Sequence, residues 1–350
     1  MALAFVEANK VKGKTLPNPA VGAVFVKAGK VVGKAGTRPA GQAHAEIVAL
    51  EAAGAKAKGS TLYVTLEPCS HHGKTPPCVD ALIAAGIKAV FIGARDANPL
   101  VGGKGIRALE KAGIKVSVGL MAAEAEAFYG GFFFSIRKGR PKIILKIAQS
   151  LDGRINHGPD EETPITGEEA RAWTHGRRAL VDAVLVSGKT LRADNPDLTP
   201  RLVKGAAAPD AIVLSRRGPF PQHANLFAQG RTSKTLVIGE SGEDLPAWVE
   251  HIRLGEFSTK SDVLAGLLAL FAKRGYHSVL VEGGRELWGL FLNADAADEL
   301  NIITAPRFLP DGERWDAGLA QDWGKSLKFR NLTPLGSDFL SEFGRSESAG

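Results

Sequence analysis

Short apolar runs alternate with helical stretches through the first 120 residues. Apolar runs bounded by glycine or polar turns predict strands, and a glycine just past a periodic stretch predicts the end of a helix. The strands expected are 21–26 and 31–32 (a hairpin), 61–66, 89–93 and 114–118, and the helices are 44–53, 78–85 and 105–111 after a first helix that begins at Met1. This alternation predicts a sheet with helices packed on its faces.

A second series of apolar runs follows and predicts a separate α/β domain. Its strands are expected at 143–148, 183–187, 211–215, 235–239, 278–281 and 300–305, with a helix at 261–273. Gly130-Gly131, followed by Arg137 to Pro141, marks the expected joint, so the domains are predicted at 1–139 and 140–345. The tail from Ser341 is small and polar, and we expect it to be disordered.

Composition supports two folded domains and excludes several classes of protein. The chain has 350 residues, 44% hydrophobic and 23% charged, which rules out a disordered chain, a collagen-like repeat and a small disulfide scaffold. No apolar run approaches the roughly 20 residues of a membrane span, and the N-terminus does not resemble a secretory signal. Two cysteines without an export signal indicate a reducing compartment, so a cytoplasmic protein is expected.

The formal charge of +7 is unevenly distributed along the chain. Residues 1–140 contain 19 Lys and Arg against 9 Asp and Glu, whereas the remainder is slightly acidic. A basic first part suggests an anionic partner, either nucleic acid or a phosphorylated metabolite. A solvated, lysine-rich surface explains the same charge, so charge alone does not decide.

Candidate metal ligands lie in the first part. Both cysteines, Cys69 and Cys78, fall in one segment, and His44-Ala45-Glu46 stands upstream. One histidine and two cysteines are usual ligands of a catalytic zinc that leaves its fourth position to water. Cys78 opens a predicted helix, where the dipole favours a thiolate, and His44 is expected in the first turn of another.

Glu46 is the candidate catalytic residue beside these ligands. It would take a proton from the water and deliver it to a ring nitrogen and then to the leaving amine, as in zinc nucleobase deaminases. Eight residues separate the two cysteines here, where that signature has two. The alternative is that both cysteines and His44 are ordinary buried residues.

Several segments resemble, in order, the bifunctional riboflavin-biosynthesis deaminase/reductase family. In the first part these are Pro17-Asn18-Pro19, His44-Ala45-Glu46, the run from Thr65 to Cys78 with its long insert, Asp96-Ala97-Asn98-Pro99 and Gly102-Gly103-Lys104-Gly105. In the second they are the run from Lys146 to Arg154, the run from Thr190 to Thr199, and Val281-Glu282-Gly283-Gly284. The matches extend from about residue 2 to about residue 310.

The resemblance implies two consecutive reactions and two folds. The first is zinc-dependent hydrolytic deamination of 2,5-diamino-6-(5-phosphoribosylamino)pyrimidin-4-one in a cytidine-deaminase-like α/β/α domain. The second is NADPH reduction of the ribosyl side chain to ribityl in a dihydrofolate-reductase-like α/β domain. The partner implied is a phosphorylated pyrimidine, with neither nucleic acid nor membrane involved. The family also favours homo-oligomers through the second domain.

Residue roles follow from the resemblance, position by position. In the first domain Asn18, Asp96 and Asn98 match substrate-binding residues, and Lys74 could meet the substrate phosphate. Asn18, Asp96 and Asn98 can also be read as simple turn formers.

In the second domain the segment from Glu282 to Arg285 follows a strand and opens a helix, where backbone N–H groups can approach a pyrophosphate. The cofactor-binding residues expected are Ala148, Thr190, Asp194, Ser215, Gly284 and Arg285. The substrate-binding residues expected are Arg178, Leu198, Arg201 and Glu282. Paired arginines suit a phosphate, and Arg177 is expected to be a solvated neighbour. Lys146 and Glu282 are candidates to polarise or protonate the opened sugar.

One departure from the family pattern leaves alternatives open. Glu162-Thr163-Pro164 stands where the family often has Ser-x-Trp, so a deaminase with an inactive reductase domain is one alternative. A deaminase acting on nucleic acid is a second, although the long insert and the appended domain argue against it. A zinc-stabilised protein without chemistry is a third, and the intact Glu46 argues against that.

Overall fold

The computed structural model describes residues 1–70, 76–98, 102–156, 164–216, 218–242, 244–253 and 259–345. The chain divides into two compact units, one of Met1–Arg140 and one of Pro141–Lys204 with Ala208–Gly350, residues 205–207 being grouped with the first. Within the described ranges no helix combines the length and the apolar character needed to cross a membrane.

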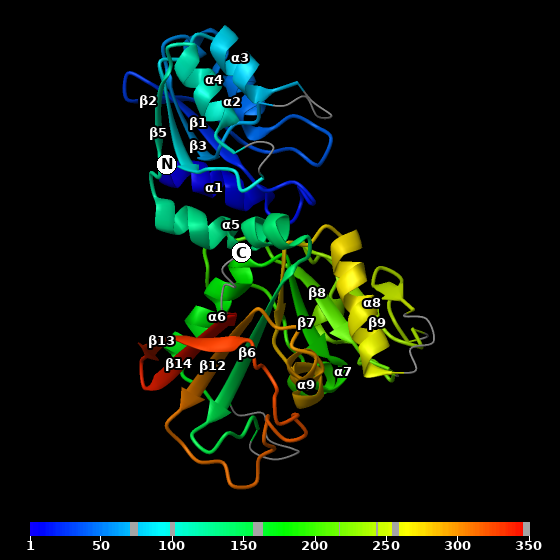
Figure 1. The fold of residues 1–350 in the computed structure, drawn as a ribbon. Helices are drawn as coiled ribbons and strands as arrows, with labels where there is room; N and C mark the ends of the chain where they lie inside the picture. Colours follow the sequence, from blue (N-terminus) through cyan, green and yellow to red (C-terminus); the bar gives the residue numbers. More distant parts are fainter. Residues whose placement is uncertain are drawn as a thin grey trace. The chain divides into compact units, whose positions relative to one another are not determined.

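The first unit is a five-stranded sheet covered by helices on both faces (Figure 1). Its strands are β1 (Gly22–Lys27), β2 (Lys30–Gly36), β3 (Thr61–Leu66), β4 (Ala89–Ala94) and β5 (Lys115–Val118), in the spatial order β2-β1-β3-β4-β5. Its helices are α1 (Ala2–Val11), α2 (Ala45–Ala53), the 3-10 turn η1 (Gly54–Ala57), α3 (Cys78–Ala84), α4 (Lys104–Lys111) and α5 (Ala122–Lys138). β1 is antiparallel to β2 and β3, whereas β3, β4 and β5 are parallel.

Small residues let two helices lie close to this sheet. A side chain at Gly22 would meet the α1 backbone, with its Cβ 1.9 Å from the Ala4 carbonyl oxygen. A side chain at Gly33 would meet α2, 2.3 Å from the Ala49 oxygen. Apolar residues of α2, α3 and α4 form one buried core with β1, β3 and β4, and aromatic residues of α1 and α5 form another.

Helix α5 runs through the glycine pair with which the predicted joint begins. Gly130 and Gly131 lie in the middle of this helix, which ends only at Lys138 with Gly139 in a left-handed conformation. Buried aromatic residues on either side of the pair, Tyr129 and Phe132, pack into the core. Their burial outweighs the low helix propensity of two glycines.

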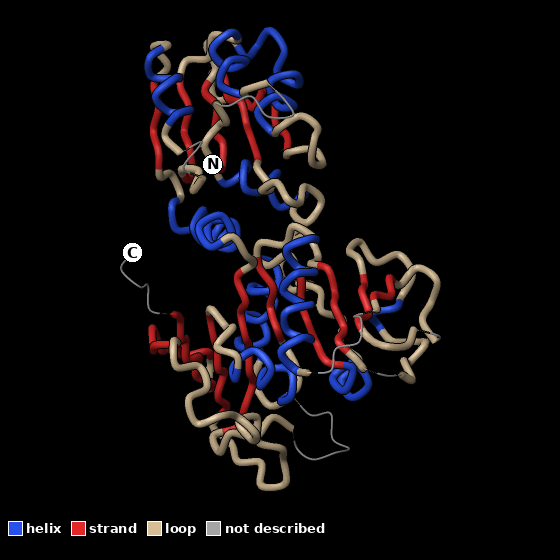
Figure 2. Tube along the Cα trace, turned by 45° about the vertical axis from the view of Figure 1, so that its right-hand side comes forward, coloured by secondary structure: helices blue, strands red, loops and turns tan. Residues whose placement is uncertain are grey.

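The second unit is built on a nine-stranded sheet, whose strands are coloured red in Figure 2. Its strands are β6 (Lys142–Ser150), β7 (Ala183–Ser187), β8 (Asp210–Leu214), β9 (Thr235–Ile238), β10 (Glu250–Ile252), β11 (Ser278–Val281), β12 (Glu299–Ala305), β13 (Leu327–Leu335) and β14 (Asp338–Arg345). Its helices are α6 (Glu168–Leu180), α7 (Gly188–Asp194), the 3-10 turn η2 (Asn225–Phe227), α8 (Lys260–Lys273) and α9 (Arg285–Asn293). The spatial order is β10-β9-β8-β7-β11-β6-β12-β14-β13.

Seven of these strands, from β10 to β12, run parallel; β14 is antiparallel to β12, and the edge strand β13 is antiparallel to β14. Strands β7, β9 and β11 are almost wholly buried, as expected when helices cover both faces. Their carboxyl ends therefore share one edge of the sheet.

The tail was wrongly expected to be disordered from Ser341 onward. Residues Asp338–Arg345 form β14, which pairs with β12 on one side and β13 on the other. Leu340 is buried against Ala170 of α6 and Ile303 of β12. Tertiary pairing thus orders a segment whose own composition is polar.

Candidate functional site

The expected residues of the first unit converge on one edge of its sheet because of the strand directions. Cys69 and Asp96 follow β3 and β4, which are parallel neighbours. Since β1 is antiparallel to β3, the loop before β1, with Asn18, reaches the same edge. β2 ends there as well, because Gly36 pairs with Gly22, and the chain then continues to His44 at the start of α2.

His44, Cys69 and Cys78 lie together at this edge. The His44 Nδ1 is 3.5 Å from the Cys69 Sγ and 3.3 Å from the Cys78 Sγ. The ligand atoms of the three residues all lie within 4.8 Å of one another. His44 is the residue that precedes α2 rather than a member of its first turn, and Cys78 is the first residue of α3. Two thiols and an imidazole are a donor set that suits zinc.

The two thiols share a proton. The side chain of Cys78 donates to the Cys69 sulfur, which also accepts the Cys78 backbone N–H at 3.4 Å. These bonds, and the neighbouring His44, lower the pKa of Cys69 to about 4, while the pKa of Cys78 is raised. A thiophilic cation would displace that proton.

Glu46 lies beside this cluster in the first turn of α2. Its side chain is buried, with 3% of the residue exposed, and it contacts the Cys78 thiol. Burial, and then the negative Cys69, raise the pKa of Glu46 to about 7. A carboxyl group with this pKa can both accept and release a proton near neutral pH.

The loop that carries Asn18 is fixed by hydrogen bonds behind it. The Asn18 carbonyl accepts the Thr15 hydroxyl at 2.9 Å, and the Tyr129 hydroxyl donates to the Ala20 carbonyl at 2.9 Å. The Thr65 Oγ1 hydrogen-bonds the same hydroxyl at 2.6 Å. Nothing in the sequence motifs singled out Tyr129, because its partners lie 64 and 109 residues away.

Asp96 and Asn98 occupy the segment after β4. The Asp96 carboxylate accepts the backbone N–H of Asn98 at 2.8 Å, so Asp96 forms the turn that was its alternative interpretation. Sequence reasoning missed Glu67, whose buried carboxylate accepts the Asp96 N–H and three further N–H groups. Lys74, the expected phosphate ligand, lies outside the described residues.

In the second unit, several expected cofactor residues meet at the carboxyl edge. Ser215 follows β8, and a Cβ on Gly188 would come within 2.1 Å of its hydroxyl. The Thr190 N–H donates to the Ser187 hydroxyl at 3.1 Å and caps α7. Ala148 lies near the end of β6, which pairs with β11.

The glycine pair before α9 packs against these residues. A Cβ on Gly283 would lie 2.7 Å from the Thr190 hydroxyl, and one on Gly284, at φ +90°, would lie 2.7 Å from the Ser187 hydroxyl. Close contact between two turns of the protein therefore requires glycine here. The first N–H groups of α9 remain without intrahelical partners, as at every helix start.

Charged residues gather next to this edge. The Arg178 guanidinium donates to both oxygens of Glu282, at 2.6 and 2.7 Å, and both side chains are largely buried. Burial opposes ionisation of Glu282, but Arg178 prevails and lowers its pKa. Burial lowers the pKa of Lys146, against the attraction of Glu282 and of Asp194. The structure thus brings Lys146, Arg178, Asp194 and Glu282 into one electrostatic group.

Arg201 and Leu198 lie near a polar cavity of about 670 Å³ that Asp194, Asp197, Thr199, Arg201 and Arg231 help to line. Arg201 is exposed and lies 3.6 Å from the Asp197 carboxylate. The Leu198 side chain is buried in the core, and its φ is +58°, so only its backbone can face a ligand.

Arg177 was wrongly expected to be solvated. Its guanidinium pairs with Glu299, a carboxylate that also accepts Lys142, and it lies over the Trp173 ring. Helix α6 places Arg177 and Arg178 toward two different buried glutamates. Adjacent arginines on a helix point in different directions, so each can find its own partner.

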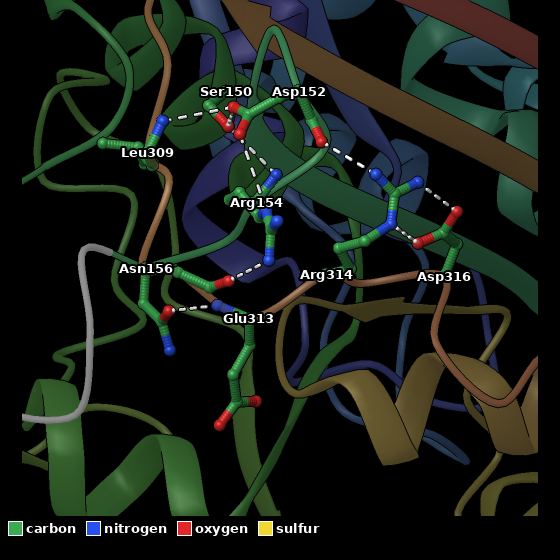
Figure 3. Close-up of polar contacts among 9 residues, drawn as sticks. Ser150, Asp152, Arg154, Asn156, Leu309, Glu313, Arg314 and Asp316 are labelled. Carbon is green, nitrogen blue, oxygen red and sulfur yellow. Dashed lines mark hydrogen bonds and ion pairs between the residues drawn. The ribbon is translucent and has the colours of Figure 1, made fainter.

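The turn after β6 is tied to the segment after β12 (Figure 3). The Asp152 carboxylate accepts the Ser150 hydroxyl at 2.6 Å and the Leu309 N–H at 3.2 Å. The Arg314 guanidinium donates to the Asp152 carbonyl at 3.0 Å and pairs with Asp316, and Arg154 donates to the Gly312 carbonyl at 2.6 Å. These bonds fix the part of the Lys146-to-Arg154 motif that rims the carboxyl edge.

Two expectations remain, Arg285 and the departure at 162–164. Arg285 is the first residue of α9 and is half-buried, within electrostatic range of Glu313. Pro164 is exposed, and Glu162 lies outside the described residues. The consequence of the departure at 162–164 stays a prediction.

Comparison with known proteins matches both units. Residues 1–94 match the family model of the cytidine and deoxycytidylate deaminase zinc-binding region, and residues 141–341 match the RibD C-terminal domain. The riboflavin biosynthesis protein RibD of Bacillus amyloliquefaciens is 39% identical over 341 residues, covering 95% of this chain and 91% of its own length. The RibD protein of Escherichia coli is 40% identical over 326 residues, covering 90% and 89%.

Solved structures are similar over the whole chain. Acinetobacter baumannii RibD has a TM-score of 0.74 at 33% identity, covering 99% of this chain and 98% of its own. A diaminohydroxyphosphoribosylaminopyrimidine deaminase/5-amino-6-(5-phosphoribosylamino)uracil reductase from Thermotoga maritima has a TM-score of 0.76 at 34% identity, covering 99% and 97%.

Proposed function

The chain belongs to the RibD family of bifunctional riboflavin-biosynthesis deaminase/reductases, and from this premise we propose how its residues divide the two reactions. The enzyme removes an amine hydrolytically from 2,5-diamino-6-(5-phosphoribosylamino)pyrimidin-4-one and then reduces the ribosyl side chain to ribityl. Its cofactors are Zn²⁺ and NADPH. The expected cytidine-deaminase-like first domain is confirmed, and the second unit is the expected α/β domain of the RibD C-terminal family.

The relatives favour the bifunctional enzyme over its alternatives. They align with both units rather than with the deaminase alone, and they carry riboflavin-biosynthesis names. A deaminase of nucleic acid, or a deaminase fused to an inactive scaffold, is therefore not favoured.

His44, Cys69 and Cys78 would hold the zinc ion. Their convergence from two helix starts and one loop, with thiol and imidazole donors, supports this assignment. Bound zinc supplies Lewis-acid activation of water.

Glu46 is the acid–base residue of the deamination. Its burial, its place beside the Cys78 thiol and its pKa of about 7 suit a group that accepts a proton from water and returns it to the substrate. Because it is buried next to the ligands rather than among them, we assign it to proton transfer and not to metal binding.

Asn18, Lys74, Asp96 and Asn98 bind the pyrimidine substrate in this proposal. Asn18, Asp96 and Asn98 follow or precede strands that end at the zinc edge. The Asp96 carboxylate already holds the Asn98 backbone, so we assign Asp96 to shaping the loop and Asn98 to contact with the ring.

NADPH would lie along the carboxyl edge of the second sheet, against Ala148, Thr190, Asp194, Ser215, Gly284 and Arg285. Three glycines there, Gly188, Gly283 and Gly284, pack closely on neighbouring hydroxyl-bearing residues. Their lack of side chains supports an edge that a cofactor can approach closely. Open α/β sheets bind ligands in the crevice outside the carboxyl ends of their strands. NADPH supplies the reducing equivalents.

Arg178, Leu198, Arg201 and Glu282 bind the phosphoribosyl substrate. Arg201 is exposed and weakly paired, so a phosphate can compete with Asp197 for its guanidinium. Leu198 contributes its backbone. Lys146, whose pKa is lowered, is positioned beside Glu282 to deliver a proton to the opened sugar.

We also propose a cytoplasmic homo-oligomer that acts on a small phosphorylated pyrimidine and not on nucleic acid or membranes. Both cysteines are free thiols, which a reducing compartment preserves for metal binding. The outermost strand β13 exposes Phe329 and Leu332, and such an edge is a natural pairing surface for a second copy.

The observation that carries the proposal is the His44, Cys69 and Cys78 cluster with Glu46 buried beside it. The test follows ammonia release and NADPH oxidation together, with zinc-loaded enzyme and the diaminopyrimidinone phosphoriboside. Ammonia release followed by NADPH oxidation is expected. Ammonia without NADPH oxidation would show that the departure at Pro164 disables the reductase, and neither signal would reject the riboflavin role.

A further inference from the structure

Glu67 is a buried carboxylate to which no step above assigns a role. It lies two residues before Cys69, and 4% of the residue is exposed. Its Oε2 accepts the backbone N–H groups of Gly103 at 2.9 Å and Asp96 at 3.4 Å. Its Oε1 accepts those of Gly105 at 3.1 Å and Ile106 at 3.3 Å. Four donors on one carboxylate is a specific arrangement, not a chance contact.

The four donors all belong to the part of the chain that leaves β4 and starts α4. Gly103, Gly105 and Ile106 supply N–H groups at the start of that helix, where none has an intrahelical partner and the dipole favours a negative charge. Asp96 supplies its N–H from the other side, directly after β4. Glu67 therefore joins the end of β3 to the end of β4.

The backbones are also in direct contact at this point. A Cβ on Gly105 would lie 2.2 Å from the carbonyl oxygen of Pro68, the residue between Glu67 and Cys69. A Cβ on Gly102 would lie 2.8 Å from the Asp96 carbonyl oxygen. The start of α4 therefore packs directly against the segment that leads to Cys69.

A short series of hydrogen bonds extends this contact to Asn98. The Asp96 carboxylate accepts the Asn98 N–H at 2.8 Å, and the Asn98 carbonyl accepts the Gly102 N–H at 2.8 Å. Asn98 is thus bound on one side by Asp96, which itself binds Glu67, and on the other by Gly102, which precedes the Glu67 partner Gly103.

We propose that Glu67 is a positioning residue of the deamination: it sets the distance between the substrate loop at Asp96 and Asn98 and the metal ligand Cys69. This inference rests on the proposed function, in which that loop holds the pyrimidine. The four hydrogen bonds described for the Glu67 carboxylate come from backbone N–H groups and not from His44, Cys69 or Cys78, so its loss is expected to affect where the ring is held rather than the proton transfer by Glu46.

Glu67→Gln tests the proposal, because the amide places an NH₂ donor against two N–H donors. The KM of the deamination rises about tenfold or more, equivalent to about 1.4 kcal/mol. Its kcat stays within about threefold, zinc stays at one per chain, and NADPH-dependent reduction is unchanged. Glu110→Gln is the matched control, since Glu110 is exposed on the same helix α4 and its variant should behave as wild type.

A double-mutant cycle with Asn98→Ala separates positioning from general structural support. If Glu67 acts through Asn98, adding Glu67→Gln to Asn98→Ala changes KM by less than about twofold. Fully additive effects on KM, or a wild-type KM in zinc-loaded Glu67→Gln, overturn the proposal. Loss of zinc from Glu67→Gln also overturns it, because Glu67 would then support the metal ligands instead.

Two further outcomes need a response: a Glu67→Gln variant that does not fold, and a wild-type enzyme that releases no ammonia. If Glu67→Gln does not fold, Glu67→Asp keeps the charge but cannot reach all four N–H groups, and the same selective rise in KM is expected; an unchanged KM overturns the proposal. If the wild-type enzyme releases no ammonia, the proposed function itself has failed, and this inference fails with it.

Discussion

Glu46 in the first unit and Glu282 in the second are both buried glutamates at an edge where ligands are expected, yet their acidities shift in opposite directions. Burial raises the pKa of each carboxyl group in isolation. Glu46 has a negative sulfur as its neighbour, so its pKa rises to about 7. Glu282 has the Arg178 guanidinium on both oxygens, so its pKa falls.

The difference shows how the two sites prepare for different chemistry. The first keeps a buried carboxyl group whose pKa is raised, poised to exchange a proton, beside donors suited to a cation. The second unit pairs its buried glutamates with cations: Arg178 binds Glu282 after β11, and Arg177 and Lys142 bind Glu299 at the start of β12.

The largest effect should come from removing the exchangeable proton in the first unit. Glu46→Gln keeps the volume and the burial but cannot transfer the proton, so the rate of ammonia release should fall by about 10²- to 10⁴-fold. Zinc should stay at about one per chain and reduction of the aminouracil intermediate should be unaffected. Rate and zinc content are measured on the same preparation.

Glu51→Gln provides the control for Glu46→Gln, because Glu51 is exposed on the same helix α2. It should leave both activities unchanged. Loss of zinc from Glu46→Gln alone would mean that Glu46 is a metal ligand, and the contrast between the two glutamates would need another explanation.

Breaking the ion pair in the second unit should have the next largest effect, this time on stability. Arg178→Ala leaves Glu282 buried without its partner, which typically costs about 3–5 kcal/mol. All five tryptophans of the chain belong to the second unit, so the urea midpoint followed by tryptophan fluorescence reports on it selectively.

Arg171→Ala is the matched variant, since Arg171 is exposed on the same helix α6. Its urea midpoint should equal that of the wild type. If Arg178→Ala and Arg171→Ala were equally stable, the Arg178–Glu282 pair would not be what neutralises the second site.

Much of this arrangement could be predicted from the sequence where local signals are strong. Strands 61–66, 183–187 and 278–281 match β3, β7 and β11 residue for residue, because each is a short apolar run ended by a turn. β13 was missed, because it is an edge strand with mostly exposed residues and lacks a clear apolar pattern. The helix at Gly130-Gly131 was not predicted, because it depends on aromatic residues around the pair whose burial is seen only in the tertiary structure.

The same limit applies to the sites. His44, Glu46, Cys69 and Cys78 could be recognised because their residue types and order carry the chemistry, and the structure places them together. The Arg178–Glu282 pair joins residues 104 positions apart, and the partners of Glu67 are backbone N–H groups 29 to 39 positions away. A sequence pattern carries no signal for a carboxylate that binds main-chain donors.

The smallest expected effect is the pH dependence of the second unit. Burial raises the pKa of Glu299, but Arg177 and then Lys142 outweigh it, so the pKa is lowered in the folded protein, as for Glu282. A carboxyl group with a depressed folded pKa stabilises the fold fully above its ordinary value of 4.5, and this contribution is lost as pH falls through the folded pKa. The urea midpoint by tryptophan fluorescence should therefore fall as pH is lowered below 4.5. Glu299→Gln should flatten that fall, whereas Glu286→Gln, at an exposed position on α9, should not. Identical pH profiles for the two variants would show that Glu299 does not share the charge balance that distinguishes this unit from the first.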